Sequence, residues 1–381
     1  MRIGFDAKRA FNNNTGLGNY SRFIIEALSS NSPPRLQRGS LGTPRHNYVL
    51  YTNKISDSSW NGFDEKSCAV KVAPPLGAGG LWRSWLIVND LVRDGIDIYH
   101  GLSNEIPFGI RKSGVKSVVT IHDLIFLRYP ELYPAIDRFI YNKKFRYACE
   151  NADAIVAVSQ QTKADIIEFY KIPSERIRVI YQDCQAMFHP STTLRVREEI
   201  LKKYALEKPY ILCVSSFSKR KNQKRLVEAF RQLDLPEYEL ILVGGKSKYA
   251  EAIFENPSLG RFDASIRGLF DVPSSDLPAL YQGASLCVYP SFFEGFGIPI
   301  VEALHSGVPV VAATGSCLEE AGGGGALYAN PLDSSDLADK MHQVLTSETL
   351  RKELIRKGSE HIKQFSGERI AGQLMELYGE L

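Results

Sequence analysis

Residues 289–304 read YPSFFEGFGIPIVEAL, and the pattern of this stretch predicts its local fold. An apolar strand ends at Tyr289, and a loop that contains Gly295 and Gly297 follows it. Pro299 is typical of the first turn of a helix, where its missing N–H group would have no partner. The backbone N–H groups at such a helix start, together with the helix dipole, attract an anion. The stretch therefore predicts a strand–loop–helix unit that can hold a phosphate group.

Two carboxylates accompany this unit, Glu294 on the loop and Glu302 on the first turns of the helix. Carboxylates accept hydrogen bonds from hydroxyl groups, so the unit suits a ligand with both phosphate and hydroxyl groups, such as a nucleotide sugar. The spacing of the two glutamates also occurs by chance, and the glycines also fit a turn without a ligand. The residues alone therefore fit a purely structural turn as well as a binding site.

Short apolar runs alternate with amphipathic stretches on both sides of this unit, which is typical of parallel sheets covered by helices on both faces. The expected strands are 3–5, 48–51, 96–99, 117–121, 154–158, 210–214, 239–243, 264–266, 285–289 and 309–312. The expected helices are 18–29, 81–94, 135–151, 160–169, 221–233, 276–283, 299–306, 334–346, 348–363 and 367–380. A polar stretch near 185–205 interrupts the pattern, so we predict two α/β domains, 1–187 and 205–362.

Three further motifs follow expected strands, at the sheet edge where doubly wound folds bind ligands. VSSFSKRKN at 214–222 places cations at a helix start, and a solvated basic helix start fits it as well. TGLGNY at 15–20 lets the backbone approach a ligand closely, although a plain turn gives the same pattern. VVTIHDL at 118–124 places a histidine at a strand end, where a structural histidine is the commoner case. Each motif is thus a candidate site with a structural alternative.

The composition excludes several classes of protein. The chain has 381 residues, of which 44% are hydrophobic and 23% charged, as in a folded globular protein. Its 46 Lys and Arg against 43 Asp and Glu leave a formal net charge of +3, too little to indicate bulk nucleic-acid binding. No apolar run approaches 18 residues, and Asp6 and Lys8 interrupt the N-terminus. We therefore expect no membrane span and no signal peptide, and a cytoplasmic location.

The cysteines and one basic segment carry further information. The six cysteines include no CxxC pair, so we expect buried free thiols and no zinc site. Between Glu26 and Asp57 the chain has no acid but four cations, and the central part, 31–46, is rich in Pro, Gly, Ser and Arg. An anionic partner, such as an acceptor or a membrane surface, and an ordinary basic loop both fit this segment.

The run SFFEGFGIPIVEAL resembles the E-x7-E motif of the retaining glycosyltransferases of family 4, with Glu294 and Glu302 as its two glutamates. The resemblance implies the GT-B fold, in which two Rossmann-like domains face a cleft and the final helix crosses back to the first domain. It assigns 1–187 and the helix 367–381 to the acceptor side, and 205–362 to the nucleotide-sugar donor.

The resemblance also implies roles for residues of the second domain. Glu294 would bind hydroxyls of the transferred sugar, and Glu302 would accept hydrogen bonds from the ribose diol. Lys221 would contact the diphosphate, with Arg220 in support because many relatives carry Gly-Arg where this chain has Ser215-Ser216. The other donor-binding residues implied are Ser216, Gly295, Phe296 and Gly297, together with Arg267, Gly268 and Leu269 in a loop beneath the nucleobase. One departure from the family is Cys317–Glu320, where relatives often have a small residue, Leu, Pro and Glu.

In the first domain the resemblance covers the glycine turn and the histidine segment. The turn supplies Gly16, Gly18, Asn19 and Tyr20 near donor phosphate or acceptor, with Thr15 where many relatives have glycine. His122 would lie near the transferred sugar, and Asp123 on the acceptor side. His100, which follows another strand, is a weaker candidate for the cleft.

The implied chemistry is glycosyl transfer, with Glu294, Lys221, Arg220 and His122 as catalytic residues. Negative charge builds on the leaving diphosphate, so fixed cations there should carry most of the catalysis. No D-x-D triplet occurs in the sequence, so we expect metal-independent transfer without a cofactor. The motifs look most like those of bacterial mannosyl- or rhamnosyltransferases of surface polysaccharide. This resemblance implies GDP-mannose as the first candidate for the donor and a UDP-sugar as the second. It also implies a glycan or lipid-linked acceptor and peripheral contact with a membrane. A GT-B epimerase or phosphorylase, and an inactive binding scaffold, are the alternatives.

Overall fold

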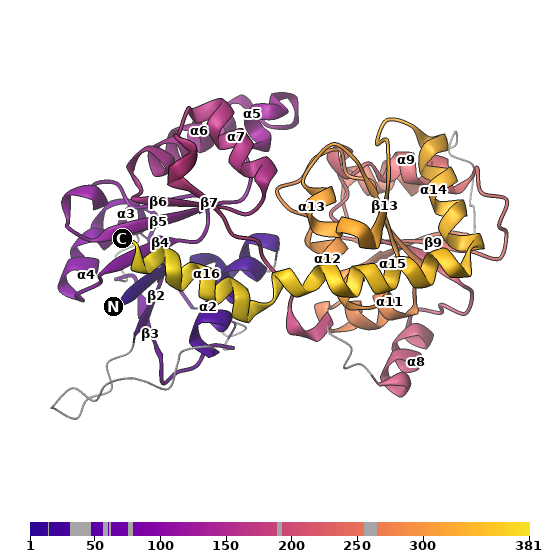
Figure 1. Cartoon of the computed structure of the whole chain (residues 1–381), viewed down its shortest axis with the longest axis horizontal. Coiled ribbons are helices and arrows are strands. Elements are labelled where there is room, and N and C mark those ends of the chain that lie inside the picture. The colour runs from indigo at the N-terminus through magenta and orange to yellow at the C-terminus, as the bar shows by residue number, and fades with distance from the viewer. Residues whose placement is uncertain are drawn as a thin grey trace. The chain divides into compact units, whose positions relative to one another are not determined.

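The computed structural model describes residues 1–13, 15–30, 47–55, 60, 62–74, 79–188, 193–254 and 265–381. The basic segment 31–46 lies outside the described residues. The chain divides into two compact units (Figure 1): Met1–Asp183 with Phe365–Leu381 form the first, and Cys184–Gln364 form the second.

The first unit is built on a parallel sheet with the strand order β3-β2-β1-β4-β5-β6-β7. Its strands are β1 (Ile3–Asp6), β2 (Tyr48–Thr52), β3 (Cys68–Val72), β4 (Ile98–Gly101), β5 (Lys116–Ile121), β6 (Ala154–Ala157) and β7 (Ile177–Val179). The central strands β1, β4, β5 and β6 are buried at every residue except Lys116, because helices cover both faces of a parallel sheet. The order reverses between β1 and β4, and ligands of doubly wound folds bind at the carboxyl edge of such a point.

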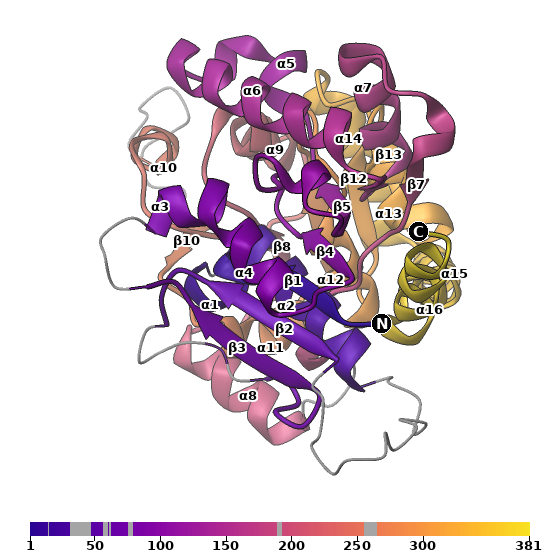
Figure 2. The same ribbon diagram turned by 90° about the vertical axis from the view of Figure 1, so that its left-hand side faces the viewer.

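Helices cover both faces of this sheet. The longer ones are α2 (Gly16–Ser30), α4 (Ile87–Arg93), α6 (Ala135–Asn151), α7 (Gln160–Tyr170) and α16 (Gly367–Gly379), and the short ones are α1 (Lys8–Asn12), α3 (Gly79–Leu81) and α5 (Ile125–Arg128). Residues of α4, α6 and α7 share one apolar core with the sheet, and α5, α6 and α7 lie on the same side of the strands in both views (Figure 2). The helix α16 packs against α2.

A buried polar chain fixes the C-terminal helix to the first sheet. The Nδ1 atom of His100 lies 2.6 Å from the Tyr378 hydroxyl of α16, and its Nε2 atom lies 2.8 Å from the Thr120 hydroxyl. Burial lowers the pKa of His100 to about 3, so the ring is neutral at ordinary pH. His100 therefore joins three elements inside the core, and the expectation that it faces a cleft is wrong.

The second unit repeats the plan with the strand order β10-β9-β8-β11-β12-β13, all parallel. Its strands are β8 (Tyr210–Val214), β9 (Glu239–Gly244), β10 (Ile266–Phe270), β11 (Leu286–Tyr289), β12 (Val310–Ala313) and β13 (Ala326–Ala329). Its helices are α8 (Leu194–Lys203), α9 (Gln223–Phe230), α10 (Lys248–Phe254), α11 (Leu277–Gly283), α12 (Ile298–His305), α13 (Leu318–Gly322), α14 (Ser334–Thr346) and α15 (Glu348–His361). Residues of α9, α10 and α14 share one core with the sheet, and α8 packs on α11.

The predicted architecture of two doubly wound parallel sheets is confirmed, and three local expectations are corrected. Residues 267–270 form the edge strand β10 rather than a loop. The helix expected over 81–94 is interrupted by a π-helical turn at Trp82–Leu86. The units divide at Asp183, so that 184–187 belong to the second unit and the polar stretch beyond them contains α8.

The structure also bears on the predictions about cysteines and about membrane-spanning helices. All six cysteines are free and buried, as predicted. Among the described residues, no helix combines the length and the apolar character that a bilayer span requires.

Candidate functional site

Two loops of the second unit meet at the carboxyl edge of its sheet, because they follow the neighbouring strands β8 and β11. The backbone N–H of Phe292 donates to the carbonyl of Arg220 at 2.9 Å. The side-chain amide of Asn222 donates to the carbonyl of Pro290 at 3.1 Å. Asn222 adopts φ 59°, a left-handed conformation that asparagine tolerates, and α9 begins directly after it. These bonds join the lysine-arginine motif to the glutamate motif.

The carboxylate of Glu294 stands at this junction and is only 8% exposed. Its Oε1 atom lies 2.6 Å from Nη1 of Arg220 and 2.7 Å from Nζ of Lys221, and it accepts a further hydrogen bond from the Ser291 hydroxyl. Lys221 also donates to the Tyr289 hydroxyl at 2.6 Å. The shortest contact that each of Arg220, Lys221 and Ser291 makes with this carboxylate is to Oε1.

The charges around Glu294 decide its protonation. Burial alone would raise the pKa of this carboxyl, but the charges of Lys221 and Arg220 outweigh burial and hold the pKa at about 2. Glu294 is therefore ionised at any working pH. Two cations against one carboxylate leave a local charge of +1, so the junction attracts an anion.

The second glutamate of the motif has the opposite environment. Glu302 lies on α12, and its Oε2 atom accepts a hydrogen bond from the Tyr281 hydroxyl at 2.9 Å. Burial raises the pKa of Glu302 to about 7, although the bond from Tyr281 opposes the shift. The carboxyl group therefore changes charge near neutral pH, and each added hydroxyl donor would favour its ionised form.

The start of α12 depends on Gly297. This residue has φ 118°, and a Cβ atom on it would lie 2.9 Å from a methyl group of Leu318. Only glycine fits both requirements. Beneath the loop, the buried Cys317 thiol donates to the carbonyls of Glu294 and Phe296 at 3.0 and 3.1 Å. The cysteine that departs from the family pattern thus supports the loop.

The remaining predicted donor residues divide into two groups. Gly295 and the buried Phe296 belong to the loop itself, and Ser216 is exposed just after β8. Arg267 instead is the second residue of the strand β10, and Gly268 and Leu269 follow it in the same strand. Its guanidinium donates to the carbonyls of Tyr204 and Ala205 at 2.7 and 2.8 Å. The structure therefore does not bring Arg267 to the glutamate loop.

In the first unit, His122 follows β5 as predicted and is held on three sides. Its Nε2 atom lies 2.9 Å from the carbonyl of Leu102, its backbone N–H donates to Asn104, and the ring of Tyr20 stands perpendicular to it at 4.6 Å. Burial lowers the pKa of His122 to about 4, so the ring is neutral. Since Nε2 donates to the carbonyl, Nδ1 is an acceptor.

The other predicted residues of the first unit stabilise their own loops. A Cβ atom on Gly18 would lie 1.8 Å from the carbonyl oxygen of Asn13, so the tight turn requires glycine. Asn19 accepts a hydrogen bond from Arg22 at 2.5 Å, and Asp123 accepts one from the backbone of Ile125 at 3.1 Å. Tyr20 bonds the Thr120 hydroxyl at 3.0 Å, while Gly16 is exposed at the start of α2. Among the predicted residues of the first unit, the structure brings Tyr20 and His122 into contact.

Sequence reasoning missed the supporting residues Ser291, Tyr289, Tyr281 and Cys317. The first two lie within or beside the quoted motif, where a hydroxyl three residues before a glutamate was the available signal. Tyr281 lies on another helix and carried no signal of its own, and Cys317 stood out only as a departure from the family pattern. Only the fold brings Tyr281 to the Glu302 carboxylate and Cys317 to the backbone of the glutamate loop.

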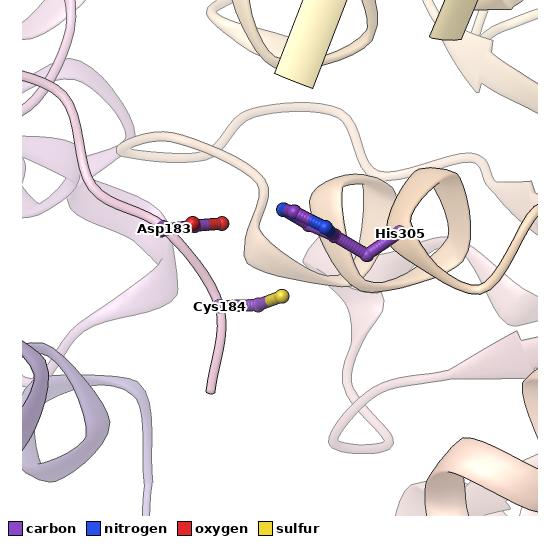
Figure 3. Close-up of side chains that lie close together, drawn as sticks. All are labelled: Asp183, Cys184 and His305. Carbon is purple, nitrogen blue, oxygen red and sulfur yellow. The ribbon is translucent and has the colours of Figure 1, made fainter. Parts of the chain in front are cut away.

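One further group of side chains contains types of residue that bind metals (Figure 3). Cys184, which opens the second unit, lies beside His305 at the end of α12, with the sulfur and a ring nitrogen within 4.8 Å. Asp183, drawn with them, ends the first unit. Two ligands within one unit fall short of the three or four protein ligands of a zinc site, so we assign no metal to them.

Comparison with known proteins identifies both halves of the chain. The family model Glycosyl transferases group 1 matches residues 196–361, and the model Glycosyltransferase Family 4 matches residues 43–182. O-antigen chain mannosyltransferase B of Escherichia coli is 32% identical over 286 residues, which cover 74% of each chain.

Solved structures show the same fold over the whole length. Sucrose-phosphate synthase from Thermosynechococcus elongatus has a TM-score of 0.75 at 20% identity, with 100% of this chain and 98% of that one covered. The Anabaena protein Alr3699/HepE, in complex with UDP and glucose, has a TM-score of 0.74 at 19% identity, with both chains fully covered.

Proposed function

The chain belongs to the family 4 glycosyltransferases and has their GT-B fold, and from the site of its second unit we propose that it transfers mannose from GDP-mannose to a growing surface polysaccharide. One observation carries the proposal. The buried, ionised Glu294 carboxylate lies within 2.7 Å of two cations, Arg220 and Lys221. A site of net charge +1 that also contains an ionised carboxylate suits a ligand that combines a diphosphate with a hydroxylated ring.

The cations serve the leaving group in this proposal. Negative charge grows on the diphosphate as the anomeric bond breaks, and fixed donors stabilise it more in the transition state than in the bound donor. Lys221, Arg220 and the backbone N–H groups at the start of α12 are these donors. Because the sequence contains no D-x-D triplet, we propose that they replace a metal ion.

The stereochemical course follows from the role of Glu294. Retention through a covalent intermediate needs a carboxylate nucleophile at the anomeric carbon. With Oε1 engaged by three donors, Glu294 is a weak nucleophile and a good hydroxyl acceptor. We therefore propose retention by attack on the same face from which the diphosphate leaves, with a phosphate oxygen taking the acceptor proton.

Two lines of support favour mannose, and GDP as its carrier is implied by the motif resemblance alone. The curated relative named above is an O-antigen mannosyltransferase, and the sequence motifs resemble the same group. The structural neighbour with UDP and glucose supports a UDP-sugar as the second candidate. For the acceptor we propose a glycan, either free or carried on a lipid.

A lipid-linked acceptor fits one surface of the first unit. Ile136, Phe139 and Ile140 lie exposed on one face of α6, and Arg138 and Lys143 flank them. An exposed apolar stripe with cations beside it suits an anionic bilayer surface. Sedimentation with phosphatidylglycerol vesicles, but not with phosphatidylcholine vesicles, would support peripheral membrane contact. Unchanged sedimentation of Phe139→Asp with phosphatidylglycerol vesicles would oppose contact through this surface.

The test of the proposed function is a panel of nucleotide sugars with the full chain, scored by calorimetric binding and by release of nucleoside diphosphate, with and without EDTA. GDP-mannose should bind best and release GDP, and EDTA should leave the rate unchanged. Preference for a UDP-sugar would reassign the donor. Donor binding without any release would favour a scaffold, and formation of an epimer or a sugar phosphate would favour the alternative enzymes.

A further inference from the structure

A second polar cluster lies at the carboxyl edge of the first sheet and was not among the predicted site residues. Asp6 ends β1 and is 2% exposed. Arg83, on the π-helical turn, holds both oxygens of this carboxylate, with Nη2 at 2.6 Å from Oδ2. Ser103 donates to the same oxygen at 3.1 Å. Burial alone would raise the pKa of Asp6, but Arg83 outweighs burial and lowers it, so the pair is ionised.

Glu105 and Lys144 extend the cluster toward solvent. The Oε2 atom of Glu105 lies 2.8 Å from Nη1 of Arg83, and Nζ of Lys144 lies 3.3 and 3.4 Å from its two oxygens. These four side chains line a narrow hollow, with Phe108 on its wall, of a size that one hydroxyl group fills. Two carboxylates and two cations line the hollow, and Lys8 interacts electrostatically with three of them. A ligand that both donates and accepts hydrogen bonds, such as a hydroxyl group, therefore fits this hollow.

An exposed aromatic shelf adjoins the hollow. Trp85, two residues beyond Arg83, is 54% exposed and stacks on Phe108, with ring centroids 4.7 Å apart and 26° between the planes. Phe108 packs on Tyr147 of α6 at 4.4 Å, so the shelf rests on a helix. The backbone N–H of Phe108 donates to the carbonyl of Ser84 at 2.7 Å and ties the two segments together. A tryptophan supported on one side and open on the other offers a rigid apolar surface.

We propose that the shelf of Trp85 and the hollow of Arg83, Glu105 and Lys144 bind one saccharide ring of the acceptor. A pyranose has an apolar C–H face and an edge of hydroxyl groups, and the two parts of this surface match them: the face lies on Trp85, and one hydroxyl enters the hollow between Glu105 and Lys144. A purely structural ion-pair network would not need an exposed tryptophan at its rim. The assignment rests on the proposed function, since it names the acceptor's chemical class.

The test separates this site from the donor site. Saturation-transfer NMR with the methyl glycosides of mannose, glucose, galactose, rhamnose and N-acetylglucosamine reports on the shelf without any donor present. We expect a signal from at least one glycoside, its loss in Trp85→Ala, and its partial retention in Trp85→Phe. Glu105→Gln should raise the dissociation constant about tenfold, the effect of one lost charged hydrogen bond. Arg83 and Asp6 are left intact because breaking a buried ion pair destabilises the fold.

Phe139→Ala is the matched control, because Phe139 is equally exposed on the same unit but lies outside the hollow. It should retain the glycoside signal. Calorimetry with GDP-mannose, UDP-glucose and the free nucleotides should give the same affinity in all variants, whereas failure of every donor in the unaltered chain would overturn the proposed function alone. No glycoside signal in the unaltered chain, or a signal that survives both Trp85→Ala and Glu105→Gln, would overturn the saccharide site.

Discussion

The Glu294 loop and the Glu302 helix start from the same chemistry and reach opposite electrostatic results. Both glutamates are 8% exposed, and they lie eight residues apart on one strand–loop–helix unit. At Glu294 two cations outweigh burial and hold the pKa at about 2, whereas at Glu302 burial prevails over a single tyrosine hydroxyl and raises the pKa to about 7. Burial alone therefore does not set the role of a carboxylate, because the nearest charges do.

The contrast supports different roles for the two carboxylates in the proposed transfer reaction. A permanently ionised carboxylate beside two cations suits the reacting sugar and diphosphate, where charge changes during the reaction. A carboxyl group that titrates near neutrality suits hydroxyls that are bound but do not react. Pairs of carboxylates whose environments move their pKa values apart commonly have such different roles.

The largest expected effect comes from removing a cation on the Glu294 side. We expect Lys221→Ala to lower turnover at least about 100-fold, or about 2.7 kcal/mol in the activation barrier, because a fixed donor to the leaving diphosphate is lost. Steady-state turnover with the preferred donor measures this. Lys221→Arg keeps the charge and should recover part of the rate. A loss below tenfold would transfer the diphosphate role to Arg220.

The two glutamates themselves give the next test. Glu294→Gln should lower turnover at least about tenfold, because a neutral amide accepts the sugar hydroxyls more weakly and leaves the two cations without their anion. Glu302→Gln should instead weaken the binding of free GDP and of GDP-mannose by similar factors and change turnover little. Calorimetry with both ligands, beside steady-state rates, separates the two. Normal transfer by Glu294→Gln would show that its assignment to the sugar is wrong.

The pH dependence of nucleotide binding sharpens the contrast. If Glu302 accepts hydrogen bonds from the ribose hydroxyls, its ionised form is the better acceptor, so binding should strengthen as pH rises through about 7 and then level off. Between pH 6 and pH 8 the affinity for GDP should increase about tenfold, and binding at pH 6 should release a proton from the protein. Calorimetry in buffers of different ionisation enthalpy measures both. Glu302→Gln should abolish this step, while Glu294, already ionised, contributes none.

The same two pKa values predict opposite contributions to stability. The raised pKa of Glu302 means that the folded state binds its proton more tightly than the unfolded state, so this stabilisation is present at low pH and is lost as pH rises through about 7. The lowered pKa of Glu294 means that the folded state favours the ionised carboxylate. This stabilisation is present above the pKa of the unfolded state and is lost as pH falls toward about 2.

The sequence predicted the Glu294 loop because its parts are contiguous: the strand, the glycines, Pro299 and the helix follow one another within a single run. It also located Lys221 correctly beside that loop, since both motifs follow neighbouring parallel strands. The prediction failed at 267–270, where Arg267 and Gly268 interrupt an apolar run on an edge strand that pairs on one side only. Polar residues are tolerated there, so the segment looked like a loop.

The opposed protonation of the two glutamates was beyond sequence reasoning. It depends on Tyr281, which precedes Glu302 by 21 residues on another helix, and on Lys221, which precedes Glu294 by 73 residues. The same holds for the polar hollow of the first unit, where Asp6, Arg83 and Glu105 meet only because β1 and β4 are adjacent in the sheet.

The smallest expected effect isolates the one hydroxyl that opposes burial at Glu302. The Tyr281 hydroxyl donates to Oε2 and lowers the pKa of Glu302, so Tyr281→Phe should raise that pKa above about 7. The midpoint of the pH dependence of GDP binding should move upward by less than one unit, with an affinity loss of a few-fold at pH 7, none at pH 9 and no change in turnover. Tyr210→Phe is the matched control, because the Tyr210 hydroxyl is equally buried and bonds the carbonyl of Leu280 on the same helix rather than a carboxylate. Both substitutions should lower thermal stability to a similar extent, but only Tyr281→Phe should move the midpoint. An unchanged midpoint in Tyr281→Phe would mean that Glu302 does not control nucleotide binding through its charge, and the contrast between the two glutamates would then lie in position alone.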